Sequence, residues 1–183
     1  MNRVGREWTK LDNAAMIFPA ASTKTDTKVF RFSCELKEPV RQELLQKATQ
    51  RALEEFPLYR SVLKRGLFWY YLESSDGEPV VKQEERPPCS LLYDRDKNSL
   101  LFQVTYYGAR INLEVYHVLS DGTGALEFLR SVVYHYLTLR YPGRFENVQL
   151  DYDASFSQKG DDSFAKYYGK KTGKPTKERT AYQ

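Results

Sequence analysis

The stretch "NLEVYHVLSDGTGALEFL", residues 112–129, holds one of the two histidines of the chain. His117 closes an apolar run, and Asp121 and Gly122 follow it within five positions. A neutral imidazole can take a proton from a hydroxyl or a thiol, so His117 fits a general base. A nearby carboxylate can orient the turn, and a glycine leaves room where a ligand approaches closely. The spacing therefore indicates acid–base chemistry at one turn.

The same residues also have structural explanations. Aspartate is a favoured N-cap, glycines are common in strand-to-helix turns, and a histidine on an apolar strand face often belongs to the core. A metal site would need further ligands nearby, and the sequence offers none, so we predict no metal. His135 lies within a helical pattern with no evident partner. Cys34 and Cys89 lack metal or redox spacing and are expected to be reduced, partly buried thiols.

The periodicity of apolar residues predicts the elements that position these groups. The alternation in "KVFRFSCEL" predicts a half-buried strand over 28–36. Apolar residues at i+4 predict an amphipathic helix over 38–56, with Pro39 in its first turn. Further strands are predicted over 67–74, 79–83, 90–93, 100–107 and 110–117. Short turns such as "SDG" at 75–77 join most of them, which favours a largely antiparallel mixed sheet.

A second long helix is predicted over 122–140, ended by Pro142 and Gly143. Its core-facing stripe is expected to consist of Ala125, Phe128, Leu129, Val132, Tyr136 and Leu139. Two long helices can cover one face of the sheet, so we expect an α/β protein built as a two-layer sandwich.

Strand parity places His117 on the apolar face of its strand, at the carboxyl end. It has the same parity as Ile111, Leu113 and Val115, and a helix N-terminus follows directly. Free N–H groups, their partial positive charge and partial burial all disfavour an imidazolium there. The local geometry therefore favours a neutral ring that can act as a base.

Composition limits the class of protein. The length of 183 residues favours one domain, and 41% hydrophobic residues allow a substantial core. The net charge of +4 comes from residues 166–183, which carry six basic residues and one acid, a balance of +5; the rest balances to −1. A nucleic-acid binder would instead carry its basic residues on a folded face, so we predict no nucleic-acid partner.

The sequence shows no targeting or membrane signal. The first residues contain no uninterrupted apolar run of the kind found in signal peptides, and no stretch approaches the ~20 apolar residues of a membrane span. We therefore expect a soluble cytoplasmic protein. Residues 1–155 are predicted to form the folded unit, and residues 156–183 a polar, basic linker.

The segment "HVLSDG", His117 to Gly122, resembles the HxxxDG motif of the CoA-dependent acyltransferase superfamily. This superfamily includes chloramphenicol acetyltransferase, carnitine acyltransferases, alcohol acetyltransferases and peptide-synthetase condensation domains. As here, the motif follows a strand and opens a helix. An early "WTKLDNAAMIFP", then a strand and a long helix ending in "FPLYRSVL", resemble the amino-terminal half of the family. Among its members the likeness is closest to the bacterial alcohol acetyltransferase-like group, which "DDSFAKYY" also resembles. The resemblance covers almost the whole chain and implies a chloramphenicol acetyltransferase-like fold.

The resemblance implies a role for each matching residue. His117 would be the general base that deprotonates a hydroxyl acceptor, while acyl-CoA would be the co-substrate, with no bound cofactor. Asp121 would be structural and paired with an arginine that the sequence does not identify. Gly122 would line the CoA channel. Condensation domains often carry a second histidine before the catalytic one, and this chain has Tyr116 there, which disfavours that subclass.

One departure from the family pattern concerns its carboxyl half. Family members have two similar halves, and the second carries a DFGWG-like motif that this chain lacks. We therefore expect an amino-terminal half whose partners are a carboxyl-terminal half, acyl-CoA and a hydroxyl-bearing small molecule, and which is inactive alone. The alternative is an inactive binding module or an accessory domain of a biosynthetic, condensation-like assembly. An exposed apolar face could then serve a partner or self-association.

Overall fold

The described part of the chain forms two β-sheets, with two long helices against the larger one. The computed structural model describes residues 8–11, 17–23, 25–67, 69–94, 97–145 and 148. The elements in chain order are β1 (Trp8–Lys10), α1 (Ile17–Ala21), β2 (Val29–Glu35), α2 (Gln42–Glu55), the 3-10 turn η1 (Pro57–Arg60), β3 (Ser61–Arg65), β4 (Tyr70–Ser74), β5 (Lys82–Gln83), β6 (Phe102–Tyr107), β7 (Arg110–Tyr116) and α3 (Gly122–Arg140).

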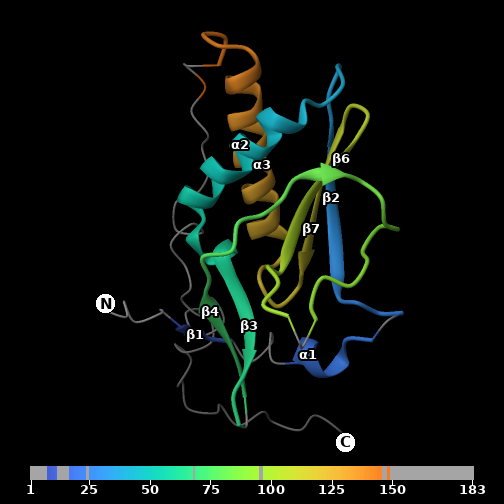
Figure 1. Ribbon diagram of the computed structural model, residues 1–183, viewed down its shortest axis with the longest axis vertical. Coiled ribbons are helices and arrows are strands. Elements are labelled where there is room, and N and C mark those ends of the chain that lie inside the picture. Colours follow the sequence, from blue (N-terminus) through green and yellow to red (C-terminus); the bar gives the residue numbers. More distant parts are fainter. Residues whose placement is uncertain are drawn as a thin grey trace, which may run out of the picture.

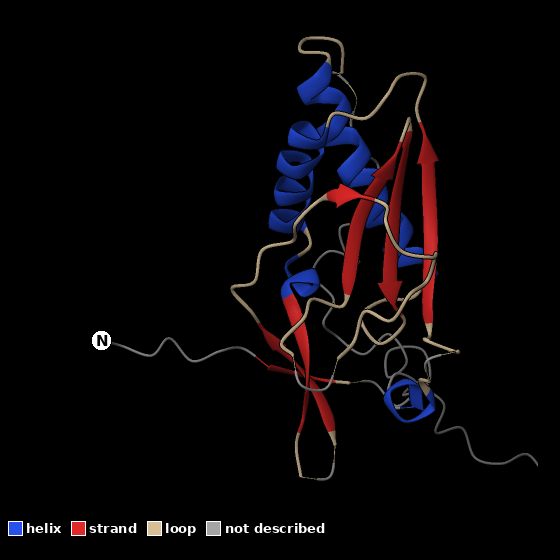
Figure 2. Ribbon diagram, turned by 45° about the vertical axis from the view of Figure 1, so that its right-hand side comes forward, coloured by secondary structure: helices blue, strands red, loops and turns tan. Residues whose placement is uncertain are grey.

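The larger sheet has the strand order β2-β7-β6-β5. The pairs β2–β7 and β6–β7 are antiparallel, and the short β5 is parallel to β6. Helices α2 and α3 pack together on one face of this sheet (Figures 1 and 2). The predicted α/β sandwich, with a largely antiparallel mixed sheet and two long helices on one face, is confirmed.

The smaller sheet was not predicted. It has the order β1-β4-β3, and its strand β3 lies in a segment to which the sequence assigned no strand. Residues 79–83 were expected to form a strand continuing from the "SDG" turn, but only Lys82–Gln83 is a strand, and it pairs with β6. The Gln46 side chain explains this, since it donates to the Pro79 carbonyl (2.8 Å) and accepts from the Val81 N–H (2.8 Å). The strand that was expected over 90–93 did not form, and these residues are an irregular segment.

Helix α2 begins later than predicted. It starts at Gln42, so Pro39 precedes the helix instead of lying in its first turn. The Val40 N–H donates to the Gly108 carbonyl (2.9 Å), and the Arg41 N–H donates to the Tyr136 hydroxyl (2.9 Å). The N–H groups of Val40 and Arg41 thus have partners outside α2, and these two bonds keep residues 39–41 out of the helix.

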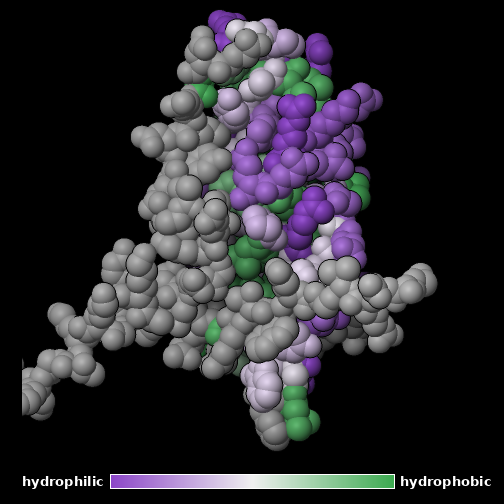
Figure 3. Space-filling view, turned by 90° about the vertical axis from the view of Figure 1, so that its left-hand side faces the viewer, coloured by the Kyte–Doolittle hydropathy of each residue, from purple (hydrophilic) through white to green (hydrophobic). Residues whose placement is uncertain are grey.

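The core lies between the helices and the larger sheet. The predicted stripe on α3 is buried from Ala125 to Tyr136, whereas Leu139 is half-buried. Phe128 is the centre of an aromatic cluster: its ring stacks on Tyr59 with 4.0 Å between centroids and meets Phe56 and Phe102 edge-on. Figure 3 shows mainly hydrophilic side chains over the described helix side. Each long helix thus has a buried apolar face and an exposed polar face, and this difference determines which face packs against the sheet.

Two sequence predictions fall outside the described residues. The linker at 156–183 lies there, as does the stretch "DDSFAKYY" at 161–168. Within the described residues, no helix is both long and apolar enough to cross a membrane.

Candidate active site

The candidate site lies where β7 ends and α3 begins. His117 directly follows β7, and its N–H donates to the Lys28 carbonyl at 2.9 Å. Lys28 has a φ of 56°, a backbone conformation that is uncommon outside glycine. The next residues, Val118 and Leu119, are buried and fix the turn to the core. His117 is therefore held at the end of β7, beside the short helix α1, whose Phe18 contacts its ring. Figure 1 shows α1 below the end of the larger sheet.

Aromatic rings surround the His117 imidazole. Phe18 of α1 stacks on it with 4.8 Å between centroids and 18° between planes. Phe30 of β2 meets it at 4.8 Å and 52°. The residue is half-buried, and no described side chain or backbone group forms a hydrogen bond with its ring nitrogens.

Asp121 caps the helix that follows. It occupies the N-cap of α3, and its Oδ1 accepts the Gly124 N–H at 2.8 Å. This bond satisfies one of the free N–H groups at the helix start. Among the described residues, no arginine forms an ion pair with the Asp121 carboxylate.

The two glycines of the turn differ in what their positions require. A Cβ at Gly122 would meet only Phe32 Cζ, at 3.9 Å, which is an ordinary contact. A Cβ at Gly124 would overlap Ser120 Oγ and crowd Asp121 Oδ1 at 3.4 Å. A methyl group at Gly124 would therefore require the Ser120 hydroxyl to turn away, whereas a methyl group at Gly122 fits without any movement.

Tyr59 carries a buried phenol in the core. Burial raises the pKa of Tyr59 far above its ordinary value, and the Asp121 carboxylate acts in the same direction. The phenol therefore stays protonated.

Tyr116, which stands where condensation domains often have a second histidine, is fully buried. Its hydroxyl lies 2.9 Å from the Ser22 hydroxyl, just after α1, and its ring stacks on Tyr93 at 5.8 Å. Sequence reasoning assigned no role to Phe18, Ser22 or Lys28. These residues lie about ninety positions or more before His117 in the sequence, so only the fold brings them close to it.

The second histidine lies elsewhere. His135 Nε2 is 2.8 Å from Glu55 Oε1, and the same carboxylate accepts the Ser131 hydroxyl at 2.6 Å. The sequence did not identify this partner of His135, since Glu55 comes from α2, far away in sequence. The described residues contain no group of three or more His, Cys, Asp or Glu that could hold a metal ion.

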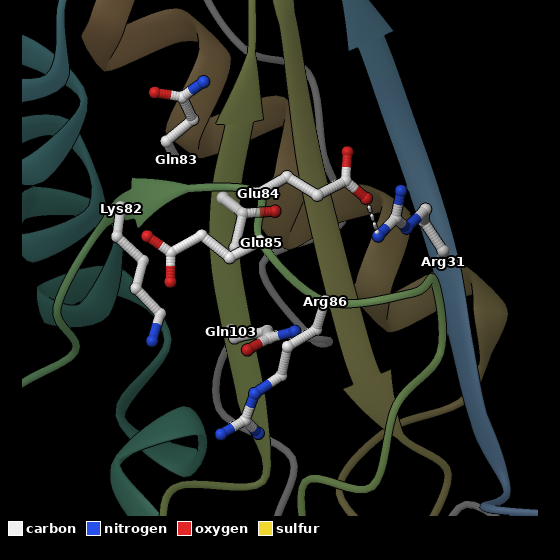
Figure 4. Close-up of a pocket in the computed structure, with 8 residues that line it drawn as sticks. Arg31, Lys82, Gln83, Glu84, Glu85, Arg86 and Gln103 are labelled. Atoms are coloured by element: carbon white, nitrogen blue, oxygen red, sulfur yellow. Dashed lines mark ion pairs between the residues drawn. The ribbon is translucent and has the colours of Figure 1, made fainter.

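A polar cluster occupies the other face of the larger sheet. The Glu114 carboxylate is buried, and its Oε1 accepts from Arg31 Nε (2.9 Å), Arg31 Nη2 (2.6 Å) and the Cys89 N–H (2.6 Å). Its other oxygen accepts from Gln103. Arg31 also pairs with Glu84 at 2.5 Å, beside a shallow surface pocket (Figure 4). That pocket is lined by Arg31, Lys82, Gln83, Glu84, Glu85, Arg86, Gln103 and Thr105.

The cluster predicts an acid-sensitive stability. The hydrogen bond from Arg31 lowers the pKa of Glu84 in the folded state. A lowered pKa contributes stability above the ordinary glutamate value, and this stability is lost as the pH falls through the lowered pKa. In Glu84→Gln, the free energy of unfolding should therefore fall less as the pH is lowered from about 7 to about 3, as measured by urea unfolding at each pH. Glu78→Gln, which removes an exposed ion pair with Arg60, should leave this pH dependence as in the wild type. A wild-type pH dependence in Glu84→Gln would contradict this contribution of Glu84 to stability.

Both cysteines are free and half-buried, as the sequence predicted. Burial raises the pKa of Cys34 and also that of Cys89, where the Glu114 carboxylate adds a smaller effect. Neither thiol is therefore activated as a thiolate.

No protein-family model matches the chain, and no curated protein matches its sequence. Its fold does match solved structures. Polyketide synthase associated protein 5 from Mycobacterium tuberculosis has 17% identity, with a TM-score of 0.54 over 73% of this chain and 34% of that one. The starter condensation domain of rhizomide synthetase has 11% identity, with a TM-score of 0.60 over 73% and 38%. The first condensation domain of the calcium-dependent antibiotic synthetase has 16% identity, with a TM-score of 0.55 over 73% and 38%.

These matches concern the fold, since the identities are low. The chain spans between 34% and 38% of the length of the three solved structures. A variant of the rhizomide starter condensation domain was solved in complex with C8-CoA. The described part of this chain therefore has an α/β fold similar to one part of these condensation domains.

Proposed function

We propose that this chain is the amino-terminal half of a CoA-dependent O-acyltransferase and that His117 is its general base. The observation that carries this proposal is the half-buried imidazole at the end of β7, which has no hydrogen-bond partner for its ring among the described residues. It lies directly before the N-terminus of α3, in a fold shared with condensation domains. The sequence likeness to alcohol acetyltransferases favours a hydroxyl as the acceptor.

The proposed reaction moves one acyl group and one proton. His117 takes the proton from the acceptor hydroxyl while that oxygen attacks the thioester carbon of acyl-CoA. The tetrahedral oxyanion then collapses, the carbon–sulfur bond breaks, and the CoA sulfur receives the proton from the imidazolium. The products are an ester and free CoA, and His117 returns to its neutral form.

Acyl-CoA is the proposed donor because one structure of this fold holds C8-CoA. In this chain, Gly122 is the residue that we expect to face the donor, since the local packing does not explain its lack of a side chain. Asp121 is proposed to keep the turn rigid through its cap on Gly124.

Gly122→Ala tests whether Gly122 faces the acyl-CoA donor. We expect a thermal stability equal to or up to about 0.5 kcal/mol above that of the wild type, because the methyl group fits and restricts the unfolded chain. The apparent KM for acyl-CoA should rise, since the methyl group would intrude on the donor. Gly124→Ala is the matched control: it adds the same methyl group, needs only a turn of the Ser120 hydroxyl, and should leave the KM for acyl-CoA unchanged. A Gly122→Ala protein with an unchanged KM would argue against donor contact.

The proposal is tested with a protein that contains this chain together with a carboxyl-terminal half. Release of the CoA thiol is followed for acyl-CoAs of two to eight carbons, with hydroxyl or amine acceptors. We expect release that depends on a hydroxyl acceptor, and none from the 183-residue chain alone. Robust turnover by the chain alone would overturn the half-enzyme proposal. No turnover in the two-half protein, with a monodisperse monomeric chain by light scattering, would favour the alternative of a binding module or accessory domain.

A further inference from the structure

We infer that Phe18 is a positioning residue for His117, held over the imidazole by a hydrogen bond between Ser22 and Tyr116. This inference rests on the proposed role of His117 and names what orients it. Helix α1, which carries Phe18, is only five residues long and has little stability of its own. Its position must therefore come from contacts with the rest of the fold.

Ser22 supplies one such contact, because its hydroxyl joins the end of α1 to Tyr116. Ser22 Oγ donates to the Phe18 carbonyl at 2.7 Å and lies 2.9 Å from the Tyr116 hydroxyl. A serine hydroxyl has one proton, so the Tyr116 hydroxyl must donate to Ser22 Oγ. Tyr116 is fully buried at the end of β7, directly before His117. The bond thus ties the end of α1 to the same strand end that carries the imidazole.

The stacking geometry shows what this tie achieves. The Phe18 ring covers one face of the His117 ring, nearly parallel at 18°, and Phe30 meets the imidazole at 52°. Rotation of the imidazole about its Cβ–Cγ bond would drive it into one of these rings. A catalytic histidine is commonly oriented by a hydrogen bond from its second ring nitrogen to a carboxylate or carbonyl. No described residue makes such a bond here, so the aromatic contacts take over the orienting role.

The test uses nuclear magnetic resonance on the 183-residue chain with labelled histidine. The chain has two histidines, and His135 on α3 serves as the internal reference. In the wild type, ring current from Phe18 should displace the His117 ring C–H signal upfield. Phe18→Leu should remove that displacement and broaden the signal, while the His135 signal stays in place. Phe18→Tyr keeps the ring and should restore the wild-type position.

The tether is tested separately. Tyr116→Phe removes the bond to Ser22, and Ser22→Ala removes that bond together with the one to the Phe18 carbonyl. Each variant should move the His117 signal part of the way, and the double variant should move it no further than Ser22→Ala alone, because the Ser22–Tyr116 bond is already lost in that variant. A His117 signal that stays in place in Phe18→Leu would overturn the inference. So would a signal that moves equally in Phe18→Leu and Phe18→Tyr, since the ring would then not matter.

The activity of the two-half protein gives the second readout. Phe18→Leu should lower kcat on the order of tenfold to a hundredfold with little change in the KM for acyl-CoA, because misorientation of the base affects the transition state. A selective rise in KM would contradict a positioning role. If His117→Ala retained full activity while the resonance results held, the proposed function would fail but the placement of Phe18 would stand.

Discussion

His117→Ala should lower the rate of acyl transfer by about 10²- to 10⁴-fold in the complete protein, the range that general base catalysis supplies. Alanine leaves no group at the end of β7 that can take the hydroxyl proton. The loss should fall on kcat, since the imidazole acts on the reacting proton and contributes little to ground-state binding. Initial rates of CoA release at saturating acyl-CoA measure this effect.

The chain provides its own matched control in His135. That ring pairs with Glu55 on the helix layer, apart from the turn that carries His117. His135→Ala should keep a rate within a few-fold of the wild type, apart from some loss of stability. The general base would be wrongly assigned if His117→Ala were as active as His135→Ala.

Glu114→Ala should lower the free energy of unfolding by about 3 kcal/mol, because it removes a buried carboxylate and leaves the half-buried Arg31 guanidinium with one partner fewer. Glu114 is buried and accepts hydrogen bonds from Arg31, the Cys89 N–H and Gln103. The value lies at the lower end of the usual range for a broken buried pair, since Arg31 keeps its contact with Glu84.

Urea unfolding at neutral pH measures this loss. Glu78→Ala is the control, since Glu78 pairs with Arg60 on the surface and should cost at most about 1 kcal/mol. Equal losses in the two variants would show that the Glu114 cluster is not a stabilising feature of the sheet.

Strong periodicity made most of the larger sheet and both long helices predictable. The alternation around Phe30 and the i+4 pattern of α3 each gave element bounds within two residues of those observed. The apolar alternation over 110–117 also located β7, which ends at Tyr116, so that His117 lies in the turn directly after it. These features are local, so the sequence contains the information that decides them.

The missed features depend on contacts between distant segments. Strands β1 and β3 occupy both sides of β4, so residues 79–81 cannot pair with β4, and the Gln46 side chain holds them along α2 instead. The tether of α1 joins Ser22 to Tyr116, and the Glu114 cluster joins three separate strands and loops. No spacing rule within one segment encodes these pairings.

The ring that covers the imidazole was missed for the same reason. Phe18 lies in "IFPA", a stretch with no chemistry of its own, and becomes relevant only through the fold. The sequence could identify the candidate base, but not the side chains that hold it.

The most direct test of acyl transfer through His117 is a single-turnover experiment with the complete protein, one equivalent of labelled acyl-CoA and excess hydroxyl acceptor. Mass measurement of the quenched mixture then counts free CoA and acylated acceptor. We predict equal amounts of the two products in the wild type and neither in His117→Ala. Free CoA without acylated acceptor, or ester formation at the wild-type rate in His117→Ala, would contradict the account.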